Sequence, residues 1–273
     1  MTVTRFAPSP TGPLHLGHAW AALLAAEQGV MHLRIEDIDR QRSKPEWERA
    51  IYDDLQWLGV DWVPPVMRQS DRMVAYHQAL DRLWDEGLLY PCICNRRDIL
   101  TAAQAPQEGA PLHGPDGVVY PGTCRGASRA GPRPRDVALR LDAAAVDDLI
   151  WIDGGALRNL SGKAFRATIG DVVLARRDFG TSYHLAVSVD DAAQGITLVT
   201  RGDDLADATP IHVALQRLLG LPTPAYYHHD LVRDESGKRL AKRDDARSIA
   251  SYRDAGWTAE ALIARLRQSR IAP

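Results

Sequence analysis

Residues 5–18 read Arg5-Phe6-Ala7-Pro8-Ser9-Pro10-Thr11-Gly12-Pro13-Leu14-His15-Leu16-Gly17-His18, and this stretch decides the fold. Residues 2–6 are typical of a short buried strand, and the prolines and Gly12 that follow exclude regular structure. From His15 onward, apolar residues recur at helical spacing. A strand, a tight turn and a helix N-terminus together favour an anion-binding site, and His15 and His18 could both face the anion. A histidine pair alone is more often structural, but the proline-rich turn before this one favours function.

Length and composition exclude several classes of protein. The chain has 273 residues, of which 45% are hydrophobic and 25% charged, as in ordinary globular proteins. It holds no apolar run of about 18 residues, so no membrane-spanning helix is predicted. A strand starts directly at the N-terminus, which leaves no room for a signal peptide. We therefore expect a cytoplasmic protein without membrane partners that acts as a monomer.

Charge is unevenly distributed although the net charge is only −2. Residues 36–62 carry eight acidic and four basic side chains, a balance of −4. Residues 125–177 carry ten basic and six acidic ones (+4), and residues 230–273 ten and seven (+3). A polyanion would be attracted to the two basic segments. On charge alone, solvated arginines on helix faces are an equally good explanation.

The order of elements predicts an α/β fold. Residues 31–36 form a second strand that ends at Glu36, and strand, turn, helix, strand is the opening of a doubly wound parallel sheet. A capping box, Ser43-Lys44-Pro45-Glu46, predicts a helix that ends at Gly59. The other elements expected are helices over 70–86, 209–219, 247–256 and 258–270, and strands over 137–141, 171–175, 183–189 and 196–200. Residues 101–135 are rich in Gly and Pro and predict an insertion made of loops.

The three cysteines lie near this insertion. Cys92-x-Cys94 and Tyr120-x-x-x-Cys124 offer three thiolates and one phenolate, which could form a closed, structural tetrahedral zinc site with one ion per chain. An odd cysteine count in a cytoplasmic protein argues against a disulfide framework. The alternative is three buried cysteines without metal.

The stretch at residues 5–18 resembles the HIGH signature of class I aminoacyl-tRNA synthetases in their glutamate- and glutamine-specific form. The resemblance extends in order over nearly the whole chain, through Arg34-Ile35-Glu36-Asp37-Ile38-Asp39, Tyr183-His184-Leu185-Ala186, Val189-Asp190-Asp191, Arg201-Gly202 and Arg239-Leu240-Ala241-Lys242-Arg243. A chance match of this extent is not credible.

The resemblance implies activation of L-glutamate by ATP with Mg²⁺. The protein must align the reactants and neutralise charge on the phosphates. Two cationic elements would do so: the helix N-terminus at His15, and the segment at residues 239–243, which is similar to the mobile KMSKS loop but has Arg239 and Ala241 in place of a lysine and the serine. The catalytic residues implied are His15, His18 and Lys242, and those that bind ATP are His15, Gly17, His18, Arg239, Lys242 and Arg243.

The resemblance also assigns the amino-acid pocket. Arginine is the better partner for a γ-carboxylate because its planar fork binds both oxygens. The glutamate-binding residues implied are Arg5 and Arg201 for the γ-carboxylate, Glu36 for the α-ammonium, and Ser9 and Tyr183 as hydroxyl donors. For each of them taken alone, a structural role is the alternative. Val187 stands where such enzymes often have a polar residue, which leaves the surroundings of the pocket open.

Only 30 residues, 244–273, follow the second motif, which is too few for an anticodon-binding domain. This truncated form, with its cysteine pattern, resembles the glutamyl-Q tRNA(Asp) synthetase family, which transfers activated glutamate to the queuosine base of tRNA(Asp). The alternatives are a fragment of an ordinary glutamyl-tRNA synthetase that charges tRNA(Glu), or a non-catalytic paralogue that binds glutamate or tRNA.

The resemblance implies a Rossmann-like doubly wound parallel sheet with an inserted zinc-binding subdomain and a short helical C-terminal segment. The predicted divisions are residues 1–90 and 178–225 for the two halves of the catalytic domain, 91–177 for the inserted acceptor-type subdomain, and 226–273 for the KMSKS loop and the helical segment, without an anticodon-binding domain.

Overall fold

The computed structural model describes residues 1–103, 113–232 and 247–268. The chain divides into two units that alternate along the sequence. Unit 1 comprises Met1–Asp71, Ile196–Asp204 and Tyr226–Pro273, and unit 2 comprises Arg72–Gly195 and Leu205–Ala225. The division into a catalytic domain, an inserted subdomain and a C-terminal segment stays a prediction from the sequence.

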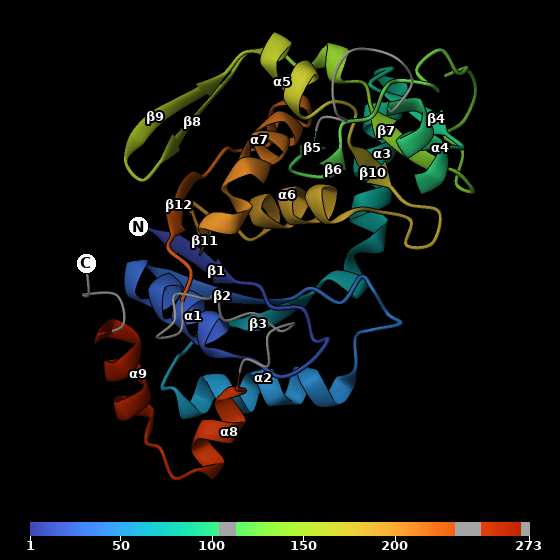
Figure 1. Cartoon of the computed structure of the whole chain (residues 1–273). Helices are drawn as coiled ribbons and strands as arrows, with labels where there is room; N and C mark the ends of the chain where they lie inside the picture. Colours follow the sequence, from blue (N-terminus) through green and yellow to red (C-terminus); the bar gives the residue numbers. More distant parts are fainter. Residues whose placement is uncertain (104–112, 233–246, 269–273) are drawn as a thin grey trace. The chain divides into compact units, whose positions relative to one another are not determined.

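Unit 1 is built from strands and helices that alternate at its N-terminus (Figure 1). Its strands are β1 (Val3–Phe6), β2 (Val30–Ile35), β3 (Val63–Arg68), β11 (Leu198–Gly202) and β12 (Ala225–His229), of which β12 begins at the last residue of unit 2. Its helices are α1 (Leu16–Gln28), α2 (Pro45–Trp57), α8 (Ile249–Asp254) and α9 (Ala259–Gln268). The short 3₁₀ helices η1 (Gln69–Arg72) and η3 (Asp203–Ala208) carry the chain into unit 2.

The strands β1, β2 and β3 pair in parallel, as the strand–turn–helix–strand order predicts. Val3 stands opposite Val30, and Phe6 opposite Leu33. The chain before β11 continues the layer on the other side of β1, since the Thr197 amide donates to the Val3 carbonyl over 2.9 Å. Parallel strands end on the same side of a sheet, so the residues that follow β1, β2 and β11 are gathered at one edge.

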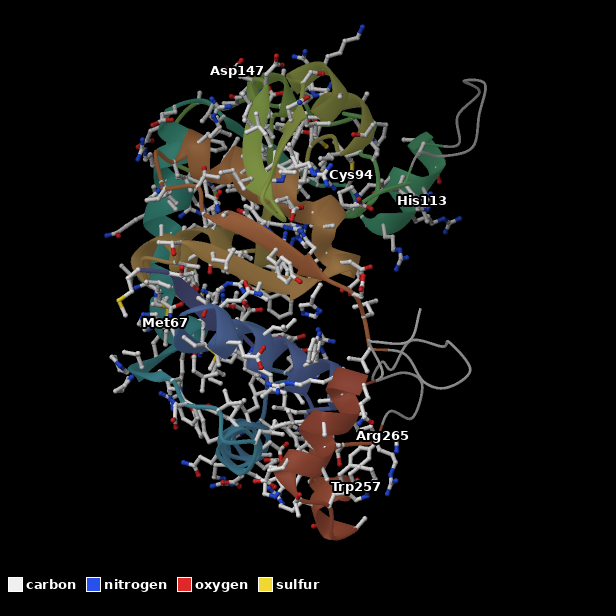
Figure 2. The ribbon with its side chains drawn as sticks, turned by 90° about the vertical axis from the view of Figure 1, so that its left-hand side faces the viewer. Met67, Cys94, His113, Asp147, Trp257 and Arg265 are labelled. Carbon is white, nitrogen blue, oxygen red and sulfur yellow. The ribbon has the colours of Figure 1, made fainter. Side chains whose placement is uncertain are left out.

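Small and branched apolar side chains join the helices of unit 1 to this sheet. Three alanines of α1, Ala19, Ala22 and Ala25, have no exposed surface and allow close approach of the helix. Ile51 and Leu55 of α2 are also fully buried, as their spacing predicts. Each such aliphatic side chain contributes roughly 1.5–3 kcal/mol by leaving water. The same core includes residues of α8 and α9. Trp257 packs against this core, and the guanidinium of Arg265 on α9 lies 5.6 Å from the centre of its ring (Figure 2).

The predicted capping box of α2 does not form. The N-cap is Lys44, in extended backbone conformation and without a side-chain cap, and Pro45 is the first helical residue. The reason is steric, because a residue before proline is driven out of the helical region. Ser43 therefore lies one residue too early to act as the cap. Glu46 and Glu48 in the first turn favour the helix electrostatically instead.

Unit 2 contains short strands in antiparallel pairs. Its strands are β4 (Leu89–Cys92), β5 (His113–Gly114), β6 (Gly117–Val118), β7 (Ala138–Leu141), β8 (Leu149–Asp153), β9 (Ala156–Leu160) and β10 (Val173–Ala175). Its helices are α3 (Met73–Asp85), α4 (Arg96–Ala103), η2 (Ala143–Ala145), α5 (Gly162–Thr168), α6 (Tyr183–Ala193) and α7 (Thr209–Leu218). β7 pairs between β10 and β4, while β5 with β6 and β8 with β9 form hairpins. Among these pairings, the parallel ones lie in unit 1 and the antiparallel ones in unit 2.

The strand predicted over residues 183–189 is wrong, because this segment is the first part of helix α6. Ser182 is the N-cap, and its hydroxyl accepts a hydrogen bond from the Leu185 amide over 3.4 Å. A short apolar run does not distinguish a buried helix from a buried strand. The end of α6 is fixed by Asp190, whose buried carboxylate accepts hydrogen bonds from Arg72 at 2.9 Å and from the Tyr76 hydroxyl at 2.7 Å.

The longest helices of the described chain, α1, α2 and α3, have 13 residues each. A helix needs about 20 apolar residues to cross a bilayer. No helix in the described ranges is long and apolar enough to do so.

The buried carboxyl of Asp54 generates a prediction about stability. Asp54 is 2% exposed, and its nearest cation, Arg253 of α8, lies 3.5 Å away. Burial raises the pKa of this carboxyl from 3.8 to about 6, although Arg253 lowers it. The folded protein thus retains this proton to a higher pH than the unfolded chain. The stability it provides is lost as the pH rises from about 4 to 6, a cost of up to about 3 kcal/mol.

We therefore expect Asp54→Asn to raise the Tm at pH 7 and to lose this advantage near pH 4. Thermal unfolding followed by circular dichroism from pH 4 to 8 measures both. The control is Asp61→Asn, which removes an equal charge from an exposed position. An identical gain at every pH would contradict the prediction.

Candidate active site and metal centre

Two imidazole rings cap the N-terminus of α1. His15 is the N-cap, and its Nδ1 accepts a hydrogen bond from the Gly17 amide over 3.1 Å. His18 Nδ1 accepts from the His15 amide over 3.2 Å, and the two ring centres lie 3.8 Å apart. Because Nδ1 is the acceptor in both rings, each ring is neutral and carries its proton on Nε2.

In this tautomer, the two rings are neutral hydrogen-bond donors. The positive potential at this point comes from the aligned backbone amides of α1. Two Nε2–H groups beside a helix N-terminus are suited to donate to phosphate oxygens.

A segment from the far end of the chain returns to this N-terminus. The Ile249 amide donates to the Leu14 carbonyl over 2.9 Å, and Ser248 forms a β-bridge with His15. The residues predicted to form the KMSKS-like loop, Arg239, Ala241, Lys242 and Arg243, lie outside the described residues. Ser248, which contacts His15, follows Arg243 by five residues in the sequence.

Arg5 and Arg201 come from neighbouring strands. Arg5, on β1, is 6% exposed, and its Nη1 donates to the Thr200 carbonyl over 3.1 Å. Arg201, the next residue along β11, is 5% exposed. The Arg5 guanidinium thus lies at the backbone of the residue that precedes Arg201 on β11. Charges buried to this degree are costly unless they are compensated.

Two residues that the sequence analysis missed orient Arg201. Its Nε donates to His228 Nε2 over 3.1 Å, and its guanidinium lies 5.4 Å from the centre of the Tyr226 ring. Both neighbours stand on β12, and their rings stack with 3° between the planes. Alternation along a strand places residues 226 and 228 on one face, so the run Tyr226-Tyr227-His228-His229 was the available signal.

Glu36 and Ser9 lie at the same edge of the sheet. The Glu36 amide donates to the Pro8 carbonyl over 3.0 Å, which extends the pairing of β1 with β2 by one step and places Ser9 beside it. The Glu36 carboxylate lies 3.4 Å from Nη2 of Arg34, a fully buried side chain. Ser9 is exposed. Glu36 therefore has one cationic neighbour within the protein, besides the α-ammonium group of glutamate that it is predicted to bind.

Tyr183 belongs to unit 2, where it begins α6 and is 38% exposed. Its ring meets the edges of His184 and His212, with ring centres 5.4 and 5.7 Å apart. His184 Nδ1 and His212 Nε2 lie 3.0 Å apart, and Asp116 of the β5–β6 hairpin lies 3.5 Å from His184 Nε2. This chain of polar groups, in which the two histidines are buried and Asp116 is exposed, supports the first turn of α6. Val187, one turn further on, is buried at 2% exposure and adds apolar packing.

The three cysteines and Tyr120 converge at the end of β4. Figure 2 labels one of them, Cys94. The three sulfurs lie within 4.8 Å of one another, with Cys94 and Cys124 3.5 Å apart. The Tyr120 hydroxyl lies 3.4 Å from Cys92 and 3.3 Å from Cys94. Around a tetrahedral zinc ion, two thiolates stand about 3.8 Å apart, and a thiolate and an oxygen about 3.5 Å apart. The four donors thus fit one small tetrahedral ion.

The surroundings of the cluster shift the pKa values of its donors in opposite directions. Burial would raise the pKa of the Cys124 thiol, but hydrogen bonds from the Tyr120 hydroxyl and the Ile93 amide outweigh it and lower the pKa to about 7. Burial raises the pKa of Cys94 to about 11 and that of Tyr120 further still. Arg140 of β7 donates to Cys92 Sγ over 3.2 Å and lies 3.8 Å from the centre of the Tyr120 ring. A cation in this position offsets the charge of a thiolate-rich centre.

Comparison with known proteins agrees with this architecture. The sequence model of the family described as tRNA synthetases class I (E and Q), catalytic domain, matches residues 1–125 and 152–273. A glutamyl-Q tRNA(Asp) synthetase of Rhodobacter capsulatus is 59% identical over 93% of this chain and 95% of its own. A protein of the same name from Nocardia farcinica is 46% identical over 98% of this chain and 85% of its own.

The fold resembles that of solved synthetases. The crystal structure of a glutamate-tRNA synthetase from Elizabethkingia anophelis superposes with a TM-score of 0.76 at 25% identity and covers 97% of this chain. A glutamate tRNA ligase from Elizabethkingia meningosepticum, solved in complex with its amino acid, gives the same score and identity. The chain spans 61% and 60% of the lengths of these two structures.

The cysteine cluster generates a prediction about metal. We expect about one zinc ion per chain and expect Cys94→Ser to lose it, because thiolates supply most of the affinity. Tyr120→Phe should weaken retention less, since three thiolates remain. Metal analysis of freshly purified protein and the rate of zinc release to a chromogenic chelator measure both effects. Ser128→Ala, outside the cluster, is the control; equal zinc content in Cys94→Ser and wild type would contradict the site.

Proposed function

Because the chain belongs to the class I tRNA synthetases for glutamate and glutamine, and within them to the glutamyl-Q tRNA(Asp) synthetase family, we propose that it activates L-glutamate with ATP and transfers it to the queuosine base of tRNA(Asp). The observation that carries the proposal is the gathering of Arg5, Arg201 and Glu36 at one edge of the parallel sheet, together with the capped N-terminus of α1. This set of groups suits an amino acid with an acidic side chain and a nucleotide.

In the activation step, an oxygen of the glutamate α-carboxylate attacks the α-phosphorus of ATP, and the bond to pyrophosphate breaks. Charge on the phosphate oxygens increases, so catalysis requires fixed donors rather than covalent help. His15 and His18 would donate through Nε2–H, and the α1 amides would add their dipole. Gly17 would approach the nucleotide through its backbone. Arg239, Lys242 and Arg243 are proposed as the second group of phosphate ligands, acting on ATP with Mg²⁺.

The amino-acid pocket follows from the charges of the substrate. Arg5 and Arg201 would bind the γ-carboxylate, and Glu36 would bind the α-ammonium. Ser9 and Tyr183 would add hydroxyl groups, Tyr183 from a helix turn supported by His184 and His212. In the second step, the queuosine acceptor attacks the activated carboxyl carbon and AMP leaves.

The zinc ion is proposed as structural, since three thiolates and a phenolate leave no open coordination position. When bound, it would join the end of β4 to the loop that carries Tyr120 and Cys124. We further propose a Rossmann-like nucleotide-binding half for the parallel sheet, a zinc-binding insertion and a short helical C-terminal segment. The proposed setting is a monomer in the cytoplasm, where the tRNA substrate is found.

The likeness to glutamate-tRNA synthetases supports a second candidate function, the charging of tRNA(Glu). The acceptor distinguishes the two. The test measures transfer of labelled glutamate to tRNA(Asp) with queuosine, tRNA(Asp) without queuosine, and tRNA(Glu).

We expect glutamate-dependent ATP–pyrophosphate exchange without any tRNA, because this chain itself supplies every group proposed for activation and the tRNA supplies none. We also expect transfer only to tRNA(Asp) that bears queuosine. Transfer to tRNA(Glu) would establish the second candidate function. Absence of both exchange and transfer at saturating glutamate and ATP would favour a non-catalytic paralogue.

Amino-acid choice gives a separate prediction. Glutamine should be a poor substrate, because its amide nitrogen would face guanidinium donors; sites built for one polar partner discriminate by about 10⁴ or more. Arg201→Gln should raise the KM for glutamate steeply and reduce its advantage over glutamine, while the KM for ATP changes little. Exchange kinetics with both amino acids measure this.

Two further variants sharpen the result. Arg201→Lys keeps the charge but loses the two-pronged geometry, so it should lie between wild type and Arg201→Gln. Arg49→Gln removes a charge from an exposed position of α2 and serves as the control. An unchanged preference for glutamate in Arg201→Gln would show that the carboxylate is bound elsewhere.

A further inference from the structure

A hollow of about 130 Å³ in unit 2 is lined by cationic side chains. His77 comes from α3, Arg133 and Arg135 from the segment before β7, and Arg176 from the residue after β10. The rest of the lining consists of small or apolar residues: Pro134, Val137, Ala175 and Gly180. None of these residues belongs to the proposed activation site or the metal centre.

Arg133 is a fixed and incompletely satisfied donor at this hollow. Its side chain is only 4% exposed, and its Nε lies 2.6 Å from the carboxylate of Asp81 on α3. The same segment is tied to α3 by Trp84 Nε1, which donates to the Gly131 carbonyl over 2.9 Å. Arg133 Nη2 is buried and has no hydrogen-bond partner within the described residues. A buried donor in this state costs free energy that an anionic ligand would recover.

The positive charges around the hollow are only partly offset by neighbouring carboxylates. Asp81 offsets Arg133, but Arg176 and its carboxylate neighbour Asp178 lie 3.5 Å apart and are both more than half exposed, which makes a weak pair. Arg135 forms no ion pair with any described residue. Burial, and then the charges of Arg133 and Arg135, lower the pKa of His77. His77 is therefore a neutral ring that can donate one hydrogen bond to an anion without adding charge.

The shape of the hollow depends on Gly180. Its φ is +68°, and a Cβ added there would lie 3.2 Å from His77 Nε2, so glycine allows the loop after β10 to approach α3 closely. The volume corresponds to roughly four water molecules. A tetrahedral anion of five heavy atoms fits this space, and its oxygens could meet guanidinium groups from more than one side.

We propose that the hollow lined by His77, Arg133, Arg135 and Arg176 binds a phosphate group of the RNA backbone. Guanidinium forks match phosphate oxygens in pairs, and such contacts position an RNA without reading its bases. Arg133, Arg135 and Arg176 are three of the ten basic residues of the segment 125–177, which has a balance of +4. The inference rests on the proposed function, because that function supplies the RNA partner.

The first test measures RNA affinity. The probe is a fluorescent synthetic RNA stem–loop with the sequence of the tRNA(Asp) anticodon arm, titrated at several KCl concentrations. Arg135→Gln and Arg176→Gln should each weaken binding several-fold and reduce the slope of log Kd against log salt by about 1, as expected for one lost phosphate contact. Arg158→Gln, an exposed arginine of β9 in the same basic segment, should change neither. Unchanged affinity and slope in both lining variants would overturn the proposal.

The second test locates the anion. Imidazole NMR of His77, assigned with His77→Gln, follows its titration with and without inorganic phosphate. A bound phosphate should raise the pKa of His77 in the wild type and leave it unaltered in Arg135→Gln. A shift in the wild type combined with wild-type RNA affinity in both lining variants would show a site for free phosphate only, and the RNA assignment would be overturned.

Exchange kinetics separate this inference from the proposed function. Arg135→Gln and Arg176→Gln should keep the wild-type rate of glutamate-dependent ATP–pyrophosphate exchange. If the wild type shows no exchange but the lining variants still lose RNA affinity and salt slope, the proposed function fails and the phosphate site stands. If exchange is normal and RNA binding is insensitive to both variants, the phosphate site fails alone.

Discussion

Parallel pairing of β1 with β2 is the constraint from which the geometry of unit 1 follows. With Val3 opposite Val30, the two strands end at the same edge, and the Glu36 amide reaches the Pro8 carbonyl. The turn after β1 must then lead directly into α1, whose first amides open at that edge. Because β11 follows the same direction beside β1, Arg201 is brought to Arg5 although the two are far apart in sequence. One pairing register therefore places the side chains proposed to bind phosphate and carboxylate on neighbouring elements of unit 1.

The parts of the fold that depend on local chemistry could be predicted from the sequence. Proline and glycine between a strand and a helix located the turn after β1, and apolar spacing located α2 and α3. Two predictions failed where local signals conflicted. The rule for capping boxes selected Ser43, but Pro45 fixed the start of α2 one residue later. The apolar run after Ser182 satisfied strand and helix equally, and capping by Ser182 with packing of both faces decided for the helix.

Other features were missed for different reasons. The β8–β9 hairpin had a usable signal, since Gly154 and Gly155 both adopt positive φ, as a two-residue turn requires. The neighbours that orient the site had weaker signals, because His212 and His228 act through contacts across 28 and 27 residues. The cysteine cluster had a stronger signal, because its side chains fall in two short motifs, Cys92-x-Cys94 and Tyr120-x-x-x-Cys124, and the structure places these side chains close together.

The arginines show why composition alone could not distinguish ligand-binding side chains from solvated surface side chains. A free arginine side chain loses about 2 kcal/mol of rotamer entropy when it is fixed on a ligand. That loss has already occurred at Arg201, which His228 and Tyr226 hold, and at Arg140, which Cys92 and Tyr120 hold. A guanidinium fixed by neighbours at one edge can bind an anion at another with little further ordering. An arginine without such neighbours loses that entropy only when it binds, so equal charge in the sequence corresponds to unequal binding capacity in the fold.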